Sequence, residues 1–215
     1  QPAEAGVLEH AVAVGEAAFV VVQPHPGLLM AVPGFNGLDE LADLRTVFFA
    51  GDRTLGGRTF ALTRQSRSAD PVLAKYRENV RWDLGGVTFL TLHMPGSNNG
   101  LGRTPEGDAE YAERNKANIA WLRQGFEHAK TDNSRAVLIM TQANLFPEFP
   151  PFPGKPQEPS GYTDIRAQLQ NETMAFGKPV VLVHGDSHFF RIDKPLSPMR
   201  VRGKVVTTGP ENFTR

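Results

Sequence analysis

The sequence predicts a single α/β domain, a layered sandwich in which helices flank a largely parallel sheet. Short apolar runs of strand length alternate with longer segments of helical periodicity between residues 85 and 183. These strand runs are almost wholly apolar, as expected of parallel strands covered on both faces. The length of 215 residues fits one domain spanning residues 1–215, and we find no internal repeat or clear linker.

The first half of this alternating core is a strand, a helix and a second strand. The strand Val87–Leu92 follows the glycine pair at Gly85. Apolar residues then recur at three- and four-residue steps, which predicts a helix over residues 108–130 with Asp108 as its N-cap. The second strand is Ala136–Met140.

The second half continues the same alternation. A helix begins near Thr163 and stops at Gly177, and the strand Val180–Val183 follows. Three further elements are expected outside the core: a strand at Ala17–Val22, a short helix capped by Asn36 and ending at Arg45, and a terminal strand at Val201–Thr208.

Composition excludes several functional classes. Lys plus Arg equals Asp plus Glu at 23 each, so the net charge indicates neither a nucleic acid nor an anionic membrane as partner. The chain has no cysteine, and any metal must therefore be held by His, Asp, Glu, Asn or Gln. No apolar run has membrane-spanning length and no signal peptide is visible, so we expect a soluble protein; a periplasmic or secreted location stays open, as does the oligomeric state.

Polar side chains follow each of the three core strands. His93 ends the first strand, Gln142 follows the second, and the run His184–His188 follows the third. Ligands of open α/β sheets bind beyond the carboxyl ends of the strands, so we expect Gln142, Asp186 and His188 to converge on one rim. His and Asp suit zinc, manganese or iron. The run also fits a hydrogen-bonded turn that closes a buried strand, and His93 also fits a structural role.

The stretch from Asn144 to Gly161 contains six prolines, which exclude a helix or a central strand. We predict that it is irregular, faces solvent and lies close to the same rim, because it leaves the second strand directly after Gln142. Two interpretations stay open: a stiff surface excursion, or a loop that flanks the substrate. The other histidines, His10, His25 and His128, have no supporting partners in the sequence.

Three segments carry a resemblance to a known family: the helical Ala117–Leu122, the strand Ala136–Gln142 and the run His184–His188. In this order they resemble the C-terminal half of calcineurin-like metallophosphoesterases. Three segments are similar to sequences of a poorly characterised bacterial branch of that superfamily: Leu44–Phe49, Gly96–Asn99 and His184–Pro195. The resemblance extends from about Gly34 to Pro195.

The resemblance implies a metal-dependent phosphoric-ester hydrolase acting on a small-molecule phosphoester. It implies that Asp186 and His188 are ligands of a divalent ion (Mn, Zn or Fe), and that Gln142 stands where the superfamily has a histidine ligand. The family pattern fixes no role for His184; in an active chain we expect a nearby histidine, His184 or His93, to be the catalytic proton donor. The superfamily's N-terminal metal motifs are not recognisable, and residues 1–33 match little, as in a divergent or incomplete start. We therefore expect the activity to be weakened or lost, with a metal site that is defective and empty or that holds a single ion. The alternative is a non-catalytic binding or scaffold domain that retains the fold.

Overall fold

The structure, a computed structural model, describes residues 11–14, 17–20, 37–56, 59–146, 160–187, 189–198, 200–202, 204–205 and 208–215. The helices are α2 (Gly37–Phe48), α3 (Gly96–Asn99), α4 (Pro105–Thr131) and α5 (Thr163–Phe176), with 3-10 turns at Gln65–Arg67 and Leu73–Lys75. The strands are β1 (Ala11–Val14), β2 (Ala17–Val20), β3 (Leu55–Gly56), β4 (Thr63–Arg64), β5 (Val80–Leu84), β6 (Val87–Thr91), β7 (Ala136–Met140), β8 (Val180–Val183), β9 (Arg200–Val201), β10 (Lys204–Val205) and β11 (Phe213–Thr214).

The main sheet has six strands in the order β11-β8-β7-β6-β5-β4. Strands β6, β7, β8 and β11 run parallel to one another. Strand β5 pairs antiparallel with β6 on one side and with β4 on the other. The predicted α/β class and mostly parallel sheet are therefore confirmed, with an antiparallel portion that the sequence did not reveal. This portion begins at the hairpin between β5 and β6, where Gly85 and Gly86 take φ angles of 58° and 76°, as a tight turn between twisted strands requires.

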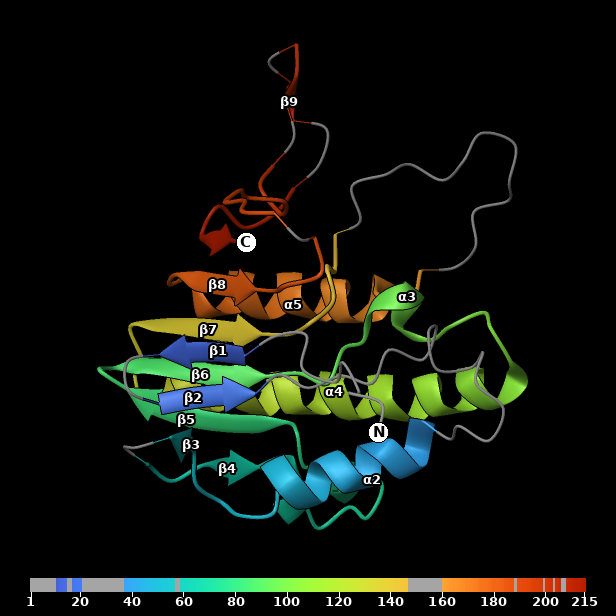
Figure 1. The fold of residues 1–215 in the computed structure, drawn as a ribbon. Coiled ribbons are helices and arrows are strands. Elements are labelled where there is room, and N and C mark those ends of the chain that lie inside the picture. The colour runs from blue at the N-terminus through green and yellow to red at the C-terminus, as the bar shows by residue number, and fades with distance from the viewer. Residues whose placement is uncertain are drawn as a thin grey trace.

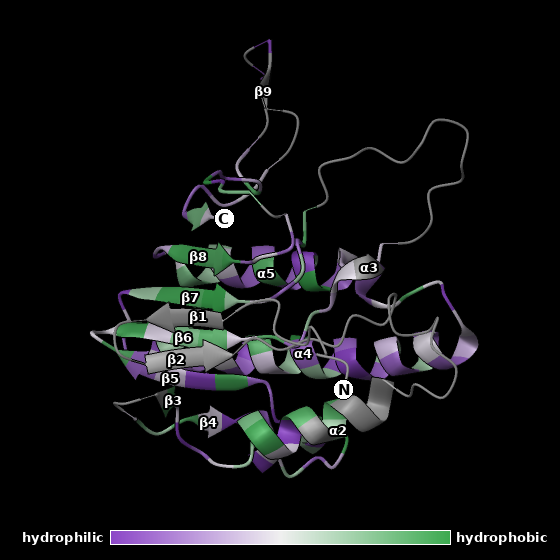
Figure 2. Ribbon diagram, in the orientation of Figure 1, coloured by the Kyte–Doolittle hydropathy of each residue, from purple (hydrophilic) through white to green (hydrophobic). Residues whose placement is uncertain are grey.

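Helices α4 and α5 lie side by side on one face of the sheet (Figure 1). Their inward residues form one apolar core with the strands, in which Leu90, Leu122, Ile139, Ile165 and Leu182 are almost completely buried. Strands β7 and β8 are coloured hydrophobic over most of their length (Figure 2), which matches their central position in the sheet. This core fixes the strand ends from which the predicted site residues project.

The opposite face of the sheet carries a smaller cluster around Val80, Trp82, Phe89 and Met140. The rings of Trp82 and Phe89 are stacked with their centroids 5.1 Å apart. Both faces of the central strands are thus apolar, which explains why these strands read as continuous hydrophobic runs.

Helix α4 begins earlier than predicted, so the prediction of Asp108 as N-cap is wrong. Thr104 is the N-cap: the Gly107 backbone N–H donates to its hydroxyl at 3.0 Å, and Pro105 takes the first helical position. Asp108 instead accepts a hydrogen bond from the Gly102 N–H at 2.7 Å. The polar segment after β6 contains the single turn α3. The predicted stop of α5 at Gly177 is confirmed.

The ends of the chain also differ from prediction. The prediction of a terminal strand at Val201–Thr208 was wrong, because β9 and β10 form an antiparallel hairpin there, with Arg202 at a φ of 49° in its turn. The terminal strand of the main sheet is β11, which pairs with β8. Strand β2 confirms Ala17–Val20 as extended, but it belongs to a three-stranded sheet with β1 and β3. Asn36 lies outside the described residues.

Candidate functional site

The three predicted strand ends stay hydrogen-bonded to one another beyond the strands themselves. The Gly185 and Asp186 N–H groups donate to the carbonyl of Gln142 at 3.3 and 3.2 Å, and the Ala143 N–H donates to the carbonyl of Met94 at 3.1 Å. The segments that follow β6, β7 and β8 are therefore held together at the carboxyl edge of the parallel strands, as the sequence predicted.

Gln142 and Asp186 meet at this edge. Gln142 Nε2 donates to Asp186 Oδ1 at 3.4 Å, and the Asn144 N–H donates to Asp186 Oδ2 at 3.0 Å. The Gly96 N–H donates to Gln142 Oε1 at 2.9 Å, which fixes the orientation of the amide. The predicted proximity of Gln142 and Asp186 is confirmed, whereas their metal-binding role stays a prediction.

Gly96 is buried against both side chains, and its lack of a side chain permits this close approach. A Cβ atom at this position would lie 3.3 Å from Asp186 Oδ1 and 3.4 Å from Gln142 Oε1. The bare backbone of Gly96 therefore faces two oxygen atoms that come from neighbouring strands.

A two-metal centre does not fit the described residues at this edge. No group of three His, Asp or Glu ligand atoms gathers around Asp186 within the described part of the chain. Gln142 also turns its NH₂ group, and not its oxygen, toward Asp186. His188, the remaining predicted ligand, lies outside the described residues.

The predicted catalytic residue His93 is buried in a separate polar network. Its Nδ1 lies 2.6 Å from Glu78 Oε1, an ion-pair contact whose N–H is not aligned as a hydrogen bond. Arg45 donates to the same carboxylate from Nε at 3.0 Å and from Nη2 at 2.6 Å. Burial alone would raise the pKa of Glu78, but His93 and Arg45 lower this pKa to about 2. The His93 ring is directed to Glu78, and among the described residues no hydrogen bond or ion pair joins it to Gln142 or Asp186.

His184, the other predicted proton donor, is half-buried directly after β8. A hydrogen bond from Arg215 is the main cause that lowers the pKa of Asp193, and His184 lowers this pKa further. Arg215 also donates from Nη1 to Asn144 Oδ1 at 2.7 Å. Strand β11 is in this way connected to the loop beside Asp186, a link that the sequence did not indicate.

Both described ends of the proline-rich stretch lie at the same edge. Asn144 contacts Asp186, and the Gly161 N–H donates to Asn98 Oδ1 at 2.8 Å. Tyr162 then donates its hydroxyl to the Pro95 carbonyl at 2.8 Å, and burial raises the pKa of Tyr162 to about 12. The predicted position near the rim is thus confirmed for these ends. The prediction that the stretch faces solvent is wrong for them, because Leu145 and Gly161 are buried. Residues 147–159 lie outside the described residues.

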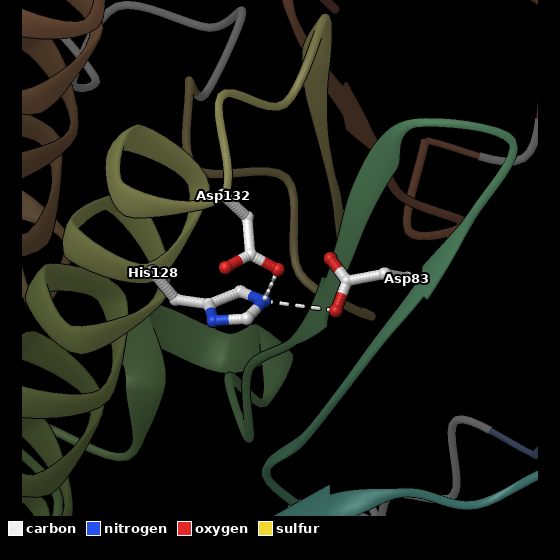
Figure 3. Close-up of side chains that lie close together, drawn as sticks. All are labelled: Asp83, His128 and Asp132. Atoms are coloured by element: carbon white, nitrogen blue, oxygen red, sulfur yellow. Dashed lines mark hydrogen bonds and ion pairs between the residues drawn. The ribbon is translucent and has the colours of Figure 1, made fainter.

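A second polar cluster, which the sequence analysis missed, lies at the opposite end of the parallel strands. His128 was expected to lack partners, and this expectation is wrong: its Nε2 lies 2.8 Å from Asp83 Oδ2 and 3.4 Å from Asp132 Oδ2 (Figure 3). The four-residue step from His128 to Asp132 on a helix was a usable signal. The approach of Asp83, 45 residues earlier, follows only from the pairing of β5 with β6.

Comparisons of the chain with protein-family models, curated proteins and solved structures found no match. Among the described residues, no helix combines the length and the apolar character needed to cross a bilayer.

Proposed function

We propose that this chain is a metal-dependent phosphoric-ester hydrolase-type domain whose activity is weakened or lost. The observation that carries the proposal is the meeting of Gln142 and Asp186 at the carboxyl edge of β7 and β8. These are the two positions at which the resemblance to calcineurin-like metallophosphoesterases expects metal ligands. A bound divalent cation would polarise a phosphoryl oxygen and lower the pKa of a coordinated water.

The chain's own residues would divide the work as follows. Asp186, together with His188, holds one cation, and Gln142 orients Asp186 through its amide. Gly96 has no side chain, which lets its backbone approach both Gln142 and Asp186. His184 follows β8 directly and supplies the leaving-group proton, because His93 is engaged with Glu78. The substrate class is a small-molecule phosphoester.

Weak activity follows from the ligand set. A two-metal phosphoesterase needs a bridging carboxylate and several ligands on each ion. Here an amide stands in the place of an imidazole, and an amide oxygen binds zinc-like metals weakly. We therefore expect a single weakly held ion, Mn²⁺ in preference to Zn²⁺.

A second candidate is a non-catalytic domain that binds a phosphoester or a protein without a metal. Both carboxylate oxygens of Asp186 already accept hydrogen bonds, from Gln142 and from the Asn144 backbone. The carboxylate is thereby satisfied without any ion.

The two candidates separate in one set of measurements. Mn²⁺ binding is followed by electron paramagnetic resonance, and hydrolysis by release of an aryl alcohol from phosphate mono- and diesters with Mn²⁺, Zn²⁺ or Fe²⁺. The proposal expects Mn²⁺ binding and slow turnover; Asp186→Asn and His188→Ala should weaken the binding and abolish the turnover, and the control Glu113→Gln, whose carboxylate pairs with Lys75, should keep both. Failure of the wild-type protein to bind Mn²⁺ would contradict the proposal and favour the second candidate, the non-catalytic binding domain. Rapid turnover would show that the activity is intact and the expectation of weakness wrong.

A further inference from the structure

The three residues of the second cluster come from separate positions that the fold brings together. Asp83 lies in β5, His128 in the last turn of α4, and Asp132 is the C-cap residue of α4. Their side chains point toward one another in Figure 3, and one potential ligand atom of each lies within 4.8 Å of the others. We propose that Asp83, His128 and Asp132 bind a zinc-like divalent cation that fastens the end of α4 to the β5–β6 hairpin.

The spacing of the three atoms suits a tetrahedral ion. Ligand bonds of about 2.0–2.2 Å place tetrahedral ligand atoms about 3.4 Å apart. His128 Nε2 and Asp132 Oδ2 already have this separation, 3.4 Å. His128 Nε2 and Asp83 Oδ2 are closer, at 2.8 Å, so a bound ion requires a sub-ångström outward shift of Asp83. All three side chains are partly exposed, at 43%, 23% and 52% for Asp83, His128 and Asp132, which permits this shift and the entry of an ion with a water as fourth ligand.

The carboxylate of Asp83 is oriented by a hydrogen bond from a buried hydroxyl group. The Thr88 hydroxyl donates to Asp83 Oδ1 at 2.7 Å, which leaves Oδ2 facing His128. Thr88 is fully buried, and its hydroxyl lies 2.8 Å from Ser134 Oγ. Carboxylate ligands of metals are commonly held in this way by hydrogen bonds to their outer oxygen.

The charges at the cluster also favour a cation. The carboxylates of Asp132 and of Asp83, which approaches from β5, lie at the C-terminal end of α4, where the helix dipole is negative. Arg81 is the basic residue whose charge acts on both Asp83 and Asp132, but it forms no ion pair within 4.0 Å with either carboxylate among the described residues. One imidazole nitrogen with two carboxylate oxygens is a ligand set that zinc and cobalt accept.

The test uses the Asp186→Asn protein as background, because this change disables the other edge of the sheet. After treatment with a chelator, Zn²⁺ binding is measured by calorimetry and the shift in melting temperature by circular dichroism. Co²⁺ replaces Zn²⁺ in a third measurement, because a tetrahedral cobalt site has a distinctive visible absorption. His128→Gln and Asp132→Asn are then added singly, and both must keep the metal-free far-ultraviolet spectrum of the background.

We expect the background protein to bind one Zn²⁺ with a rise in melting temperature and to show the tetrahedral cobalt spectrum. His128→Gln and Asp132→Asn should each weaken Zn²⁺ binding by about tenfold or more and remove the spectrum. Asp132→Asn is the variant that tests the proposal if His128→Gln changes the fold. An absence of Zn²⁺ binding in the background would overturn the proposal, and so would binding of equal strength in the variants. Neither result bears on the proposed function, which concerns Asp186.

Discussion

Gln142 donates its side-chain amide to Asp186 across the neighbouring strands β7 and β8, with Nε2 3.4 Å from Oδ1. The same amide accepts from the Gly96 N–H through its oxygen, so the side chain is held at both ends. The side-chain NH₂ group of Gln142, a neutral hydrogen-bond donor, therefore faces Asp186, where a metal ligand would have to offer a lone pair.

Gln142→His should raise the affinity for a divalent cation at Asp186 by about tenfold or more, because imidazole is a better donor than an amide to zinc-like metals. Hydrolysis of an aryl phosphate should rise with it. The measurement is a titration with Mn²⁺ and Zn²⁺, with Gln142→Ala as the control that removes the amide and adds no ligand. Equal affinities in Gln142→His and Gln142→Ala would show that position 142 is no ligand position.

Glu78 should make stability depend on pH in the acid range. Its pKa in the folded protein, about 2, is below its ordinary value of 4.5. The stabilisation is thus complete above about pH 4.5 and is lost as the pH falls toward 2. Glu78→Gln should lower the free energy of unfolding at pH 7 by about 3 kcal/mol, since a charged partner of a buried pair is lost.

Denaturant unfolding between pH 7 and pH 2 checks this prediction. The Glu78→Gln protein should lose less stability than the wild type between pH 4.5 and 2. Glu113→Gln is the matched control, because Glu113 pairs with Lys75 at an exposed position and its removal should cost less than about 1 kcal/mol. Parallel pH profiles for the wild type and Glu78→Gln would contradict the assignment of the buried pair.

Gly161→Ala should be destabilising by about 1–3 kcal/mol. The space above Gly161 is filled by the backbone carbonyl of Asn98, which cannot move aside as a flexible side chain could. Gly51→Ala is the control: nothing lies within 4 Å of the added Cβ, so its effect should stay within about 0.5 kcal/mol. Thermal unfolding of the two variants decides the matter, and equal melting temperatures would mean that α3 and Gly161 are not packed as described.

Arg215→Lys should lower the free energy of unfolding by about 1–2 kcal/mol. Arg215 binds Asp193 through two nitrogens, with Nε at 3.0 Å and Nη2 at 2.6 Å, and a lysine cannot form this fork. The control is Arg123→Lys, because Arg123 is exposed on α4 and the substitution keeps its charge. Hydrogen exchange provides a second readout: the Phe146 N–H should exchange faster only in Arg215→Lys, since the Asn144 loop loses its contact with Arg215.

The sequence by itself determined the alternation of strands and helices between Val87 and Val183. Hydrophobic periodicity and helix-stop residues such as Gly177 act locally, over a few neighbours along the chain. The same local pattern placed Gln142 and Asp186 at strand ends, and parallel pairing of β7 with β8 was enough to bring them together.

Only the tertiary structure decided the contacts that depend on strand register and on side-chain direction. His93 turns to Glu78, and His128 meets Asp83 across 45 positions, because β5 pairs antiparallel with β6 at one particular register. A shift of one residue in this register would turn Asp83 to the other face of the sheet, away from His128. Register is set by the packing of the whole core, which no short stretch of sequence displays, and it is this packing that gathers Asp83, His128 and Asp132.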